Sequence, residues 1–160
     1  MPAAPAAPAA PVALIVEEDP ELRQLASALL EESALDVIAC ESAEAALSVL
    51  QRRNGRVVLV FADVDLAGLI DGVDLARLVT MRWPGTKVIV TGASRARVDR
   101  LPRDTAYMQK PWRGLDVLIA AEQVLPVPGI RRQRMGERLK ARDGERKRTL
   151  SPFGYRQSRA

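Results

Sequence analysis

Short runs of β-branched and other apolar residues alternate along the chain with longer segments in which apolar residues recur at helical spacing. The short runs have the length of strands, and the longer segments predict amphipathic helices. Because helical segments separate successive strands, the pattern favours parallel strands joined by crossover helices. The expected strands are residues 12–16, 35–40, 57–62, 87–90 and 105–108.

Residues that start and stop helices mark the segments between the strands. Asp19 suits a helix N-cap and Pro20 the first helical position, and Ser42 is a second predicted cap. Asn54-Gly55 is expected to stop the second helix. The expected helices are residues 20–33, 42–54, 73–82 and 115–125, with a weak and short helical pattern over 94–100.

The run 57–62 is apolar at every position, which is typical of a central parallel strand covered on both faces. It ends on Asp63. The five strand-helix units of residues 12–125 therefore predict one α/β domain, built as a five-stranded, doubly wound parallel sheet. Ligands of such sheets bind outside the carboxyl ends of the strands.

Composition changes at both ends of the predicted domain. Residues 1–11 are a Pro/Ala-rich leader of low complexity, expected to be disordered. Residues 126–160 carry 11 Lys/Arg against 3 Asp/Glu, whereas residues 1–125 carry 13 against 17. The net charge of +4 thus comes from a basic tail, which we expect to be disordered. The alternative is a tail that binds a polyanion or an acidic partner.

The chain contains no histidine and a single cysteine, Cys40. This composition excludes serine-histidine hydrolases, papain-like proteases and histidine-based zinc enzymes. Any chemistry must use carboxylates, hydroxyls and lysines. No apolar run is long enough to span a membrane, and the N-terminus lacks the pattern of a secretory signal, so we expect a cytoplasmic location.

Polar side chains that could support chemistry follow four of the predicted strands: Glu17 and Glu18, Asp63, Thr91, and Lys110. The ends of parallel strands meet at one edge of the sheet, so we expect these side chains to lie together. Three carboxylates repel one another unless cations hold them, and Mg²⁺ is a hard cation that prefers oxygen ligands. Lys110 supplies a second positive charge.

A carboxylate flanked by a metal ion and a lysine can attack phosphorus, because the charge of the transferring group is neutralised. Asp63 is the expected nucleophile, and its product is an aspartyl phosphate. Thr91 could donate its hydroxyl to a phosphoryl oxygen. Its rotation toward that oxygen would couple phosphorylation to the surface beyond the fourth strand.

Five segments of the chain resemble, in order and spacing, the motifs of the receiver domains of bacterial response regulators, and the resemblance covers about residues 12–125. These segments are Val16-Glu17-Glu18-Asp19-Pro20, Phe61-Ala62-Asp63-Val64-Asp65, Asp71-Gly72, Val90-Thr91-Gly92-Ala93 and Tyr107-Met108-Gln109-Lys110-Pro111.

The resemblance implies a flavodoxin-like fold and a phosphorelay in which a histidine kinase or histidine phosphotransfer protein phosphorylates Asp63, with no turnover of an independent substrate. It also implies a cis Lys110-Pro111 bond and a downstream protein target. Because residues 126–160 are too few for a winged-helix output domain, we expect a single-domain regulator. By position, Thr91 and Tyr107 would form the switch. Mg²⁺ would be held by Glu17 through water, by Glu18 and Asp63 directly, and by the backbone carbonyl of Asp65.

The sequence departs from the family at two positions near the site. Glu18 stands where aspartate is usual, and Ala67 stands where proline is usual in a loop that is slightly long. These departures support an alternative, a pseudo-receiver that acts as a phosphorylation-independent interaction module.

A remote alternative is a phosphatase of the haloacid-dehalogenase type, because Asp63-Val64-Asp65 resembles its nucleophile motif. In those phosphatases, however, the nucleophile motif closes the first strand, whereas here Asp63 closes the third and the acidic pair Glu17-Glu18 precedes it. The sequence leaves open the cognate kinase, the downstream target and whether the chain forms a homodimer.

Overall fold

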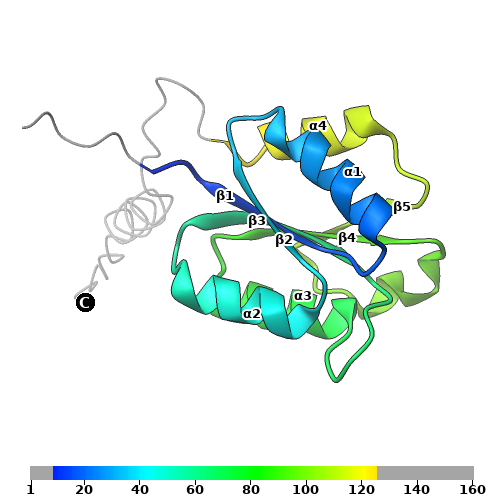
Figure 1. The fold of residues 1–160 in the computed structure, drawn as a ribbon. Helices are drawn as coiled ribbons and strands as arrows, with labels where there is room; N and C mark the ends of the chain where they lie inside the picture. Colours follow the sequence, from blue (N-terminus) through cyan, green and yellow to red (C-terminus); the bar gives the residue numbers. More distant parts are fainter. Residues whose placement is uncertain (1–8, 126–160) are drawn as a thin grey trace, which may run out of the picture. The chain divides into compact units, whose positions relative to one another are not determined.

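The computed structural model describes residues 9–125, which form a parallel sheet with helices on both faces (Figure 1). The sheet has five strands in the order β2-β1-β3-β4-β5, so the expected doubly wound, flavodoxin-like fold is confirmed. The strands are β1 (Val12–Val16), β2 (Asp36–Cys40), β3 (Val57–Asp63), β4 (Lys87–Gly92) and β5 (Thr105–Gln109). The helices are α1 (Pro20–Glu31), α2 (Ala43–Arg52), α3 (Gly72–Arg82), the 3₁₀-helix η1 (Arg95–Arg100) and α4 (Gly114–Glu122).

The predicted helix starts are confirmed by their caps. The Asp19 carboxylate accepts the N–H groups of Glu21 and Leu22 at 2.8 and 3.1 Å, and Ser42 accepts that of Ala45 at 3.2 Å. These side chains satisfy N–H groups that a helix start leaves without a backbone partner.

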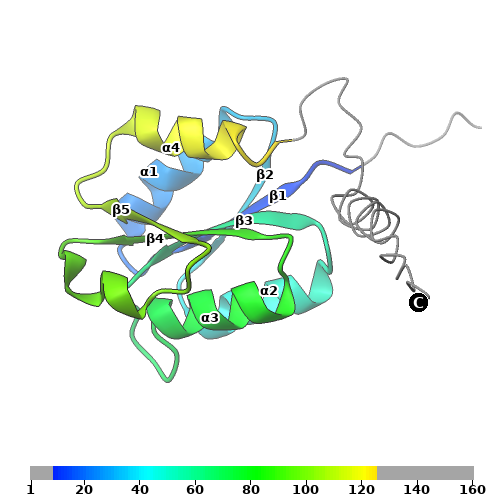
Figure 2. The ribbon, with the colours of Figure 1, turned by 180° about the vertical axis from the view of Figure 1, so that it is seen from behind.

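Helices α1 and α4 cover one face of the sheet, and α2 and α3 cover the other (Figures 1 and 2). Each face has its own apolar core. Leu14 and Val60 belong to the core under α2 and α3, whereas Ile15 and Phe61 belong to the core under α1 and α4. This two-sided burial explains why β1 and most of β3 are apolar without alternation.

Several predicted boundaries move by a few residues. Strand β3 extends to Asp63, which pairs with Thr91, and β4 extends to Gly92, which pairs with Gln109 of β5. Helix α4 ends at Glu122 rather than at the expected residue 125. The weak pattern over 94–100 forms the single 3₁₀ segment η1, which buries none of its residues.

Residues 126–160, and with them the predicted basic tail and its partners, lie outside the described residues, as does most of the predicted leader. Within residues 9–125, no helix has the length and apolar character needed to cross a membrane.

Cys40, at the end of β2, gives a test of the packing. Its thiol is buried, and this burial raises its pKa above the usual 9.0, although nearby Arg52 opposes the shift. We expect Cys40 to react with a thiol reagent at least about 100-fold more slowly in the native protein than in denaturant, because reaction requires opening of the strand and formation of the thiolate. Equal rates in both conditions would contradict the described burial.

Candidate functional site

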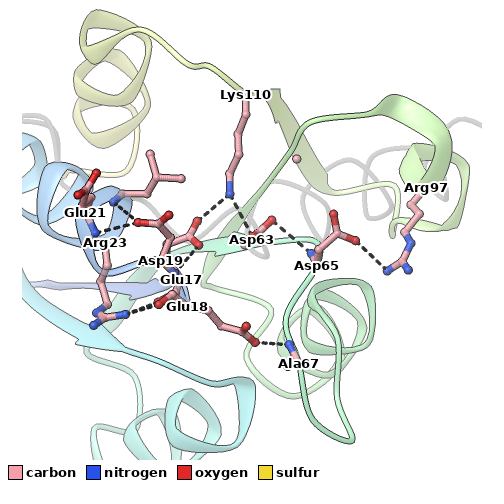
Figure 3. A network of polar contacts seen from close by, with 12 residues as sticks. Glu17, Glu18, Asp19, Glu21, Arg23, Asp63, Asp65, Ala67, Arg97 and Lys110 are labelled. Carbon is pink, nitrogen blue, oxygen red and sulfur yellow. Dashed lines mark hydrogen bonds and ion pairs between the residues drawn. The ribbon is translucent and has the colours of Figure 1, made fainter.

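The ammonium group of Lys110 lies between two carboxylates at the carboxyl ends of the strands (Figure 3). Its Nζ is 2.8 Å from Glu17 Oε2 and 3.0 Å from Asp63 Oδ2. The three side chains are 18%, 9% and 13% exposed, respectively. They form a largely buried cluster of one cation and two carboxylates. The cluster has a net negative charge, which a further cation could balance.

The strand order explains how these residues meet. Glu17 follows β1 and Asp63 ends β3, and these neighbouring strands form the point at which the order of the sheet reverses. Lys110 follows the edge strand β5, and its backbone N–H donates to the Gly92 carbonyl at 2.8 Å. This bond fixes the lysine beside β4, from where its long side chain reaches the carboxylates.

The surroundings of Lys110 favour its charged form. Burial of the ammonium lowers the pKa, but hydrogen bonds and charge interactions with Glu17 and Asp63 oppose burial and leave the pKa of Lys110 above the usual 10.5. The lysine is therefore a permanent countercharge for Asp63 at neutral pH.

Replacing Lys110 with methionine is expected to lower the free energy of unfolding by about 2 kcal/mol at neutral pH, because two poorly hydrated carboxylates lose their partner. A lysine whose pKa is higher in the folded than in the unfolded protein contributes its full stabilisation at a pH below the unfolded-state pKa. That contribution is lost as the pH rises through the folded-state pKa. The difference between wild type and Lys110→Met should therefore shrink between about pH 9 and about pH 12. Urea unfolding in buffer with a chelator measures it.

Lys87→Met is the matched control, because Lys87 Nζ donates to the neutral amide oxygen of Gln123 at 2.8 Å. Its effect should depend little on pH over the same range. A pH-independent effect of Lys110→Met would show that the ion pairs do not contribute as described.

Glu18 does not join the cluster but turns the other way (Figure 3). Its carboxylate accepts a hydrogen bond from the Ala67 N–H in the loop after β3. The backbone at this turn is held by Arg23, whose Nη1 donates to the carbonyls of Glu17 and Glu18 at 2.7 and 3.0 Å. Of the two glutamates after β1, only Glu17 pairs with Lys110.

The site suits a hard divalent cation in its chemistry, because carboxylates from the ends of β1 and β3 converge there. Glu17 and Asp63 already share one positive charge, the ammonium of Lys110. In the part of the chain that the structure describes, no three acidic, histidine or cysteine side chains are grouped as a metal site. Glu18 is the predicted ligand that would have to turn.

The side chain of Asp65 points away from Asp63, toward the segment η1. Its carboxylate lies 3.6 Å from Arg97 Nη1, which also lies 3.2 Å from Asp71 Oδ2. The backbone N–H of Asp65 donates to Asp63 Oδ1 at 3.2 Å, so both oxygens of Asp63 have partners. Arg97 thus ties η1 to the loop that follows the candidate acceptor.

The hydroxyl of Thr91 is available for a further bond. Thr91 is 1% exposed and pairs with Asp63 across the β3–β4 ladder, and its Oγ1 has no hydrogen-bond partner within residues 9–125. A buried hydroxyl without a partner is unfavourable unless another group completes it. Its position beside Asp63 suits the predicted contact with a phosphoryl oxygen.

Tyr107 is held in place on the neighbouring strand. Its hydroxyl lies 2.7 Å from the carbonyl oxygens of Gly92 and of Ser94, and the Arg95 guanidinium lies 5.5 Å from its ring centre. Together these contacts join the end of β4 to β5. The predicted cis bond between Lys110 and Pro111 is present. The roles of Thr91 and Tyr107 in switching stay predictions.

Three residues that shape this region were not predicted from the sequence: Arg23, Arg97 and Glu44. Glu44, in the first turn of α2, accepts the Leu69 N–H at 3.2 Å. Each of these residues contacts either a segment far from it in the chain or the other side of a turn. The local sequence pattern therefore does not predict its contacts. The three arginines within residues 95–100 were the only signal for Arg97.

Comparison with known proteins gives consistent results. Residues 13–110 match the family described as the response regulator receiver domain. The response regulator protein FleR of Pseudomonas aeruginosa is 35% identical over 122 residues, which cover 72% of this chain and 25% of FleR. The chain thus matches about a quarter of the length of that relative.

Solved structures agree on the fold. The signal receiver domain of an HD domain-containing protein from Pseudomonas fluorescens Pf-5 has a TM-score of 0.64 and 22% identity, covering 72% of this chain and 94% of that one. A response regulator receiver protein from Sinorhizobium medicae has a TM-score of 0.65 and 20% identity, with the same coverage of 72% and 94%.

Proposed function

The chain belongs to the family of response regulator receiver domains, and from this premise we propose that it accepts a phosphoryl group on Asp63 in a two-component phosphorelay. The observation that carries the proposal is the pairing of Asp63, at the end of the central strand β3, with Lys110 at 3.0 Å. A partly exposed carboxylate with a fixed positive neighbour can meet a phosphorylated donor whose negative charge would otherwise repel it.

In the proposed reaction, a carboxylate oxygen of Asp63 attacks the phosphorus of a phosphohistidine or an acyl phosphate. The bond from phosphorus to the donor nitrogen or oxygen breaks, and the donor keeps the electron pair. The ammonium of Lys110 and the hydroxyl of Thr91 would contact the new phosphoryl oxygens. The phosphoryl group would thus give the Thr91 hydroxyl the hydrogen-bond partner that it lacks.

Mg²⁺ belongs to the same proposal, expected to be held by Glu17 through water, by Glu18 and Asp63 directly, and by the backbone carbonyl of Asp65. When bound, it would neutralise charge that develops on the transferring group. Glu17 would contribute while remaining bonded to Lys110, whereas Glu18 would first leave the Ala67 N–H.

The proposed donor is a histidine kinase or a histidine phosphotransfer protein. A mostly apolar cleft of about 360 Å³ lies beside Lys110, lined by residues of α1, by Ala93 after β4 and by the β5–α4 loop. Leu25 of α1 lines this cleft and is 49% exposed. An apolar surface next to the acceptor is where a donor protein could bind while its histidine reaches Asp63.

Incubation with acetyl phosphate and Mg²⁺, followed by intact mass measurement and phosphate quantification, tests the proposal. We expect one added phosphoryl group per chain that hydroxylamine removes, since hydroxylamine cleaves acyl phosphates. Continuous release of phosphate without accumulation of modified protein would instead indicate a phosphatase.

A chain that neither gains a phosphoryl group nor releases phosphate would be a phosphorylation-independent interaction module. One observation favours this second candidate: Glu18 is turned toward Ala67 instead of toward Asp63. The same incubation therefore separates all three functions.

A further inference from the structure

The loop between β3 and α3 is held at its tip by two glutamates from other parts of the fold. Glu18, after β1, accepts the Ala67 N–H, and Glu44, in α2, accepts the Leu69 N–H at 3.2 Å. Gly68 between them has φ +109, and a Cβ at this position would lie 3.1 Å from Glu44 Oε1. The glycine thus permits both the turn and the close approach of the carboxylate.

Apolar burial contributes little at this tip. Ala67, Gly68 and Leu69 are exposed, and the side chain of Leu69 is 96% exposed. Only the flanks of the tip are anchored, by the buried Leu66 and the half-buried Ile70. The two glutamates are therefore the contacts that decide how firmly residues 67–69 are held.

The two glutamates after β1 differ in their bonding partners. Glu17 is bonded through both oxygens, to Lys110 Nζ at 2.8 Å and to the Asp19 N–H at 3.1 Å. Within the described residues, no lysine or arginine forms an ion pair with Glu18, whose carboxylate is bonded to a neutral N–H. Glu18 is thus the carboxylate that a cation at this edge of the sheet would attract most readily.

We propose that Glu18 exchanges between two partners, the Ala67 N–H and a divalent cation bound with Asp63, so that binding of the cation releases the tip of the loop. This inference rests on the cation site of the proposed function. Because coupling between two equilibria is reciprocal, the bond from Ala67 to Glu18 also weakens cation binding. Removing that bond should therefore strengthen cation binding. The longer side chain of glutamate, compared with aspartate, is what allows one residue to reach both partners.

Amide hydrogen exchange with and without Mg²⁺, in the absence of any phosphoryl donor, tests the exchange of partners. With saturating Mg²⁺, we expect the Ala67 amide to exchange about tenfold faster, which corresponds to the loss of one hydrogen bond to a charged group. The Leu69 amide, held by Glu44, should change less. Calorimetric titration with MgCl₂ establishes that the cation is bound.

Three variants separate the two partners of Glu18. Glu18→Gln keeps an acceptor for Ala67 but loses the charge, so Mg²⁺ should no longer accelerate exchange there. Glu18→Asp shortens the side chain, so Ala67 should exchange fast in both conditions and Mg²⁺ should bind about tenfold more tightly. Glu44→Gln is the matched control. It removes a carboxylate that contacts the loop but is not an expected ligand of the cation, so it should preserve the response of Ala67 to Mg²⁺.

The inference is overturned if calorimetry detects no binding of Mg²⁺, if bound Mg²⁺ leaves the exchange of Ala67 unchanged, or if Glu18→Gln responds as wild type does. None of these measurements uses a phosphoryl donor. Failure here is therefore distinct from failure of Asp63 to accept a phosphoryl group, which the acetyl phosphate incubation reports.

Discussion

Replacing Gly72 with alanine is expected to destabilise the domain by at least about 3 kcal/mol, a large share of the roughly 5–15 kcal/mol that stabilises an ordinary domain. Gly72 is the first residue of α3 and is buried. A Cβ at this position would lie 2.0 Å from the carbonyl oxygen of Asp63 and 2.7 Å from Cα of Val64. Both are backbone atoms of the segment that carries the candidate acceptor, so no side-chain rotation can relieve the overlap.

Two other glycines separate the possible causes of this loss. An alanine Cβ at Gly85 would have no atom within 4 Å, and Gly85 has no positive φ, so Gly85→Ala should change the free energy of unfolding by less than about 0.5 kcal/mol. Gly55 also has free space but a φ of +78, and Gly55→Ala should cost about 1 kcal/mol through backbone strain alone. Urea unfolding followed by tryptophan fluorescence measures all three. If Gly72→Ala unfolds at the same urea concentration as Gly85→Ala, α3 does not pack on β3 as described.

The elements of the fold could be predicted from the sequence because their signals are local. The apolar run before Asp63 marks the central strand, and Asp19-Pro20 marks the start of α1 within one residue. The weak pattern over 94–100 also predicted a short or irregular helix, which forms as η1. The ends of strands were less well predicted, because pairing with a neighbouring strand sets where each ladder stops.

The convergence of Glu17, Asp63 and Lys110 could be predicted for a similar reason, since the carboxyl ends of parallel strands meet at one edge. The directions of its side chains could not. Glu17 and Glu18 are neighbours of equal chemistry, yet one bonds to Lys110 and the other to Ala67. The partner of Glu18 lies in the β3–α3 loop, which Glu44 also contacts although it lies far from the loop in sequence.

The largest expected functional effect is that of Asp63→Asn. The amide is nearly the same size as the carboxylate but is a poor nucleophile, so phosphoryl acceptance from acetyl phosphate should fall at least about 1,000-fold. The fold should persist, because Lys110 keeps Glu17 as a charged partner at 2.8 Å. A phosphate-affinity gel and intact mass measurement after donor treatment report the result.

Asp65→Asn is the matched control for Asp63→Asn. Asp65 lies two residues further along, but its carboxylate faces Arg97 at 3.6 Å, and only its backbone N–H bonds to Asp63. This variant should therefore still gain one phosphoryl group, although the weakened contact to Arg97 can alter the rate. Equal modification of wild type and Asp63→Asn would place the acceptor elsewhere, and loss of modification in Asp65→Asn alone would exchange the roles of the two aspartates.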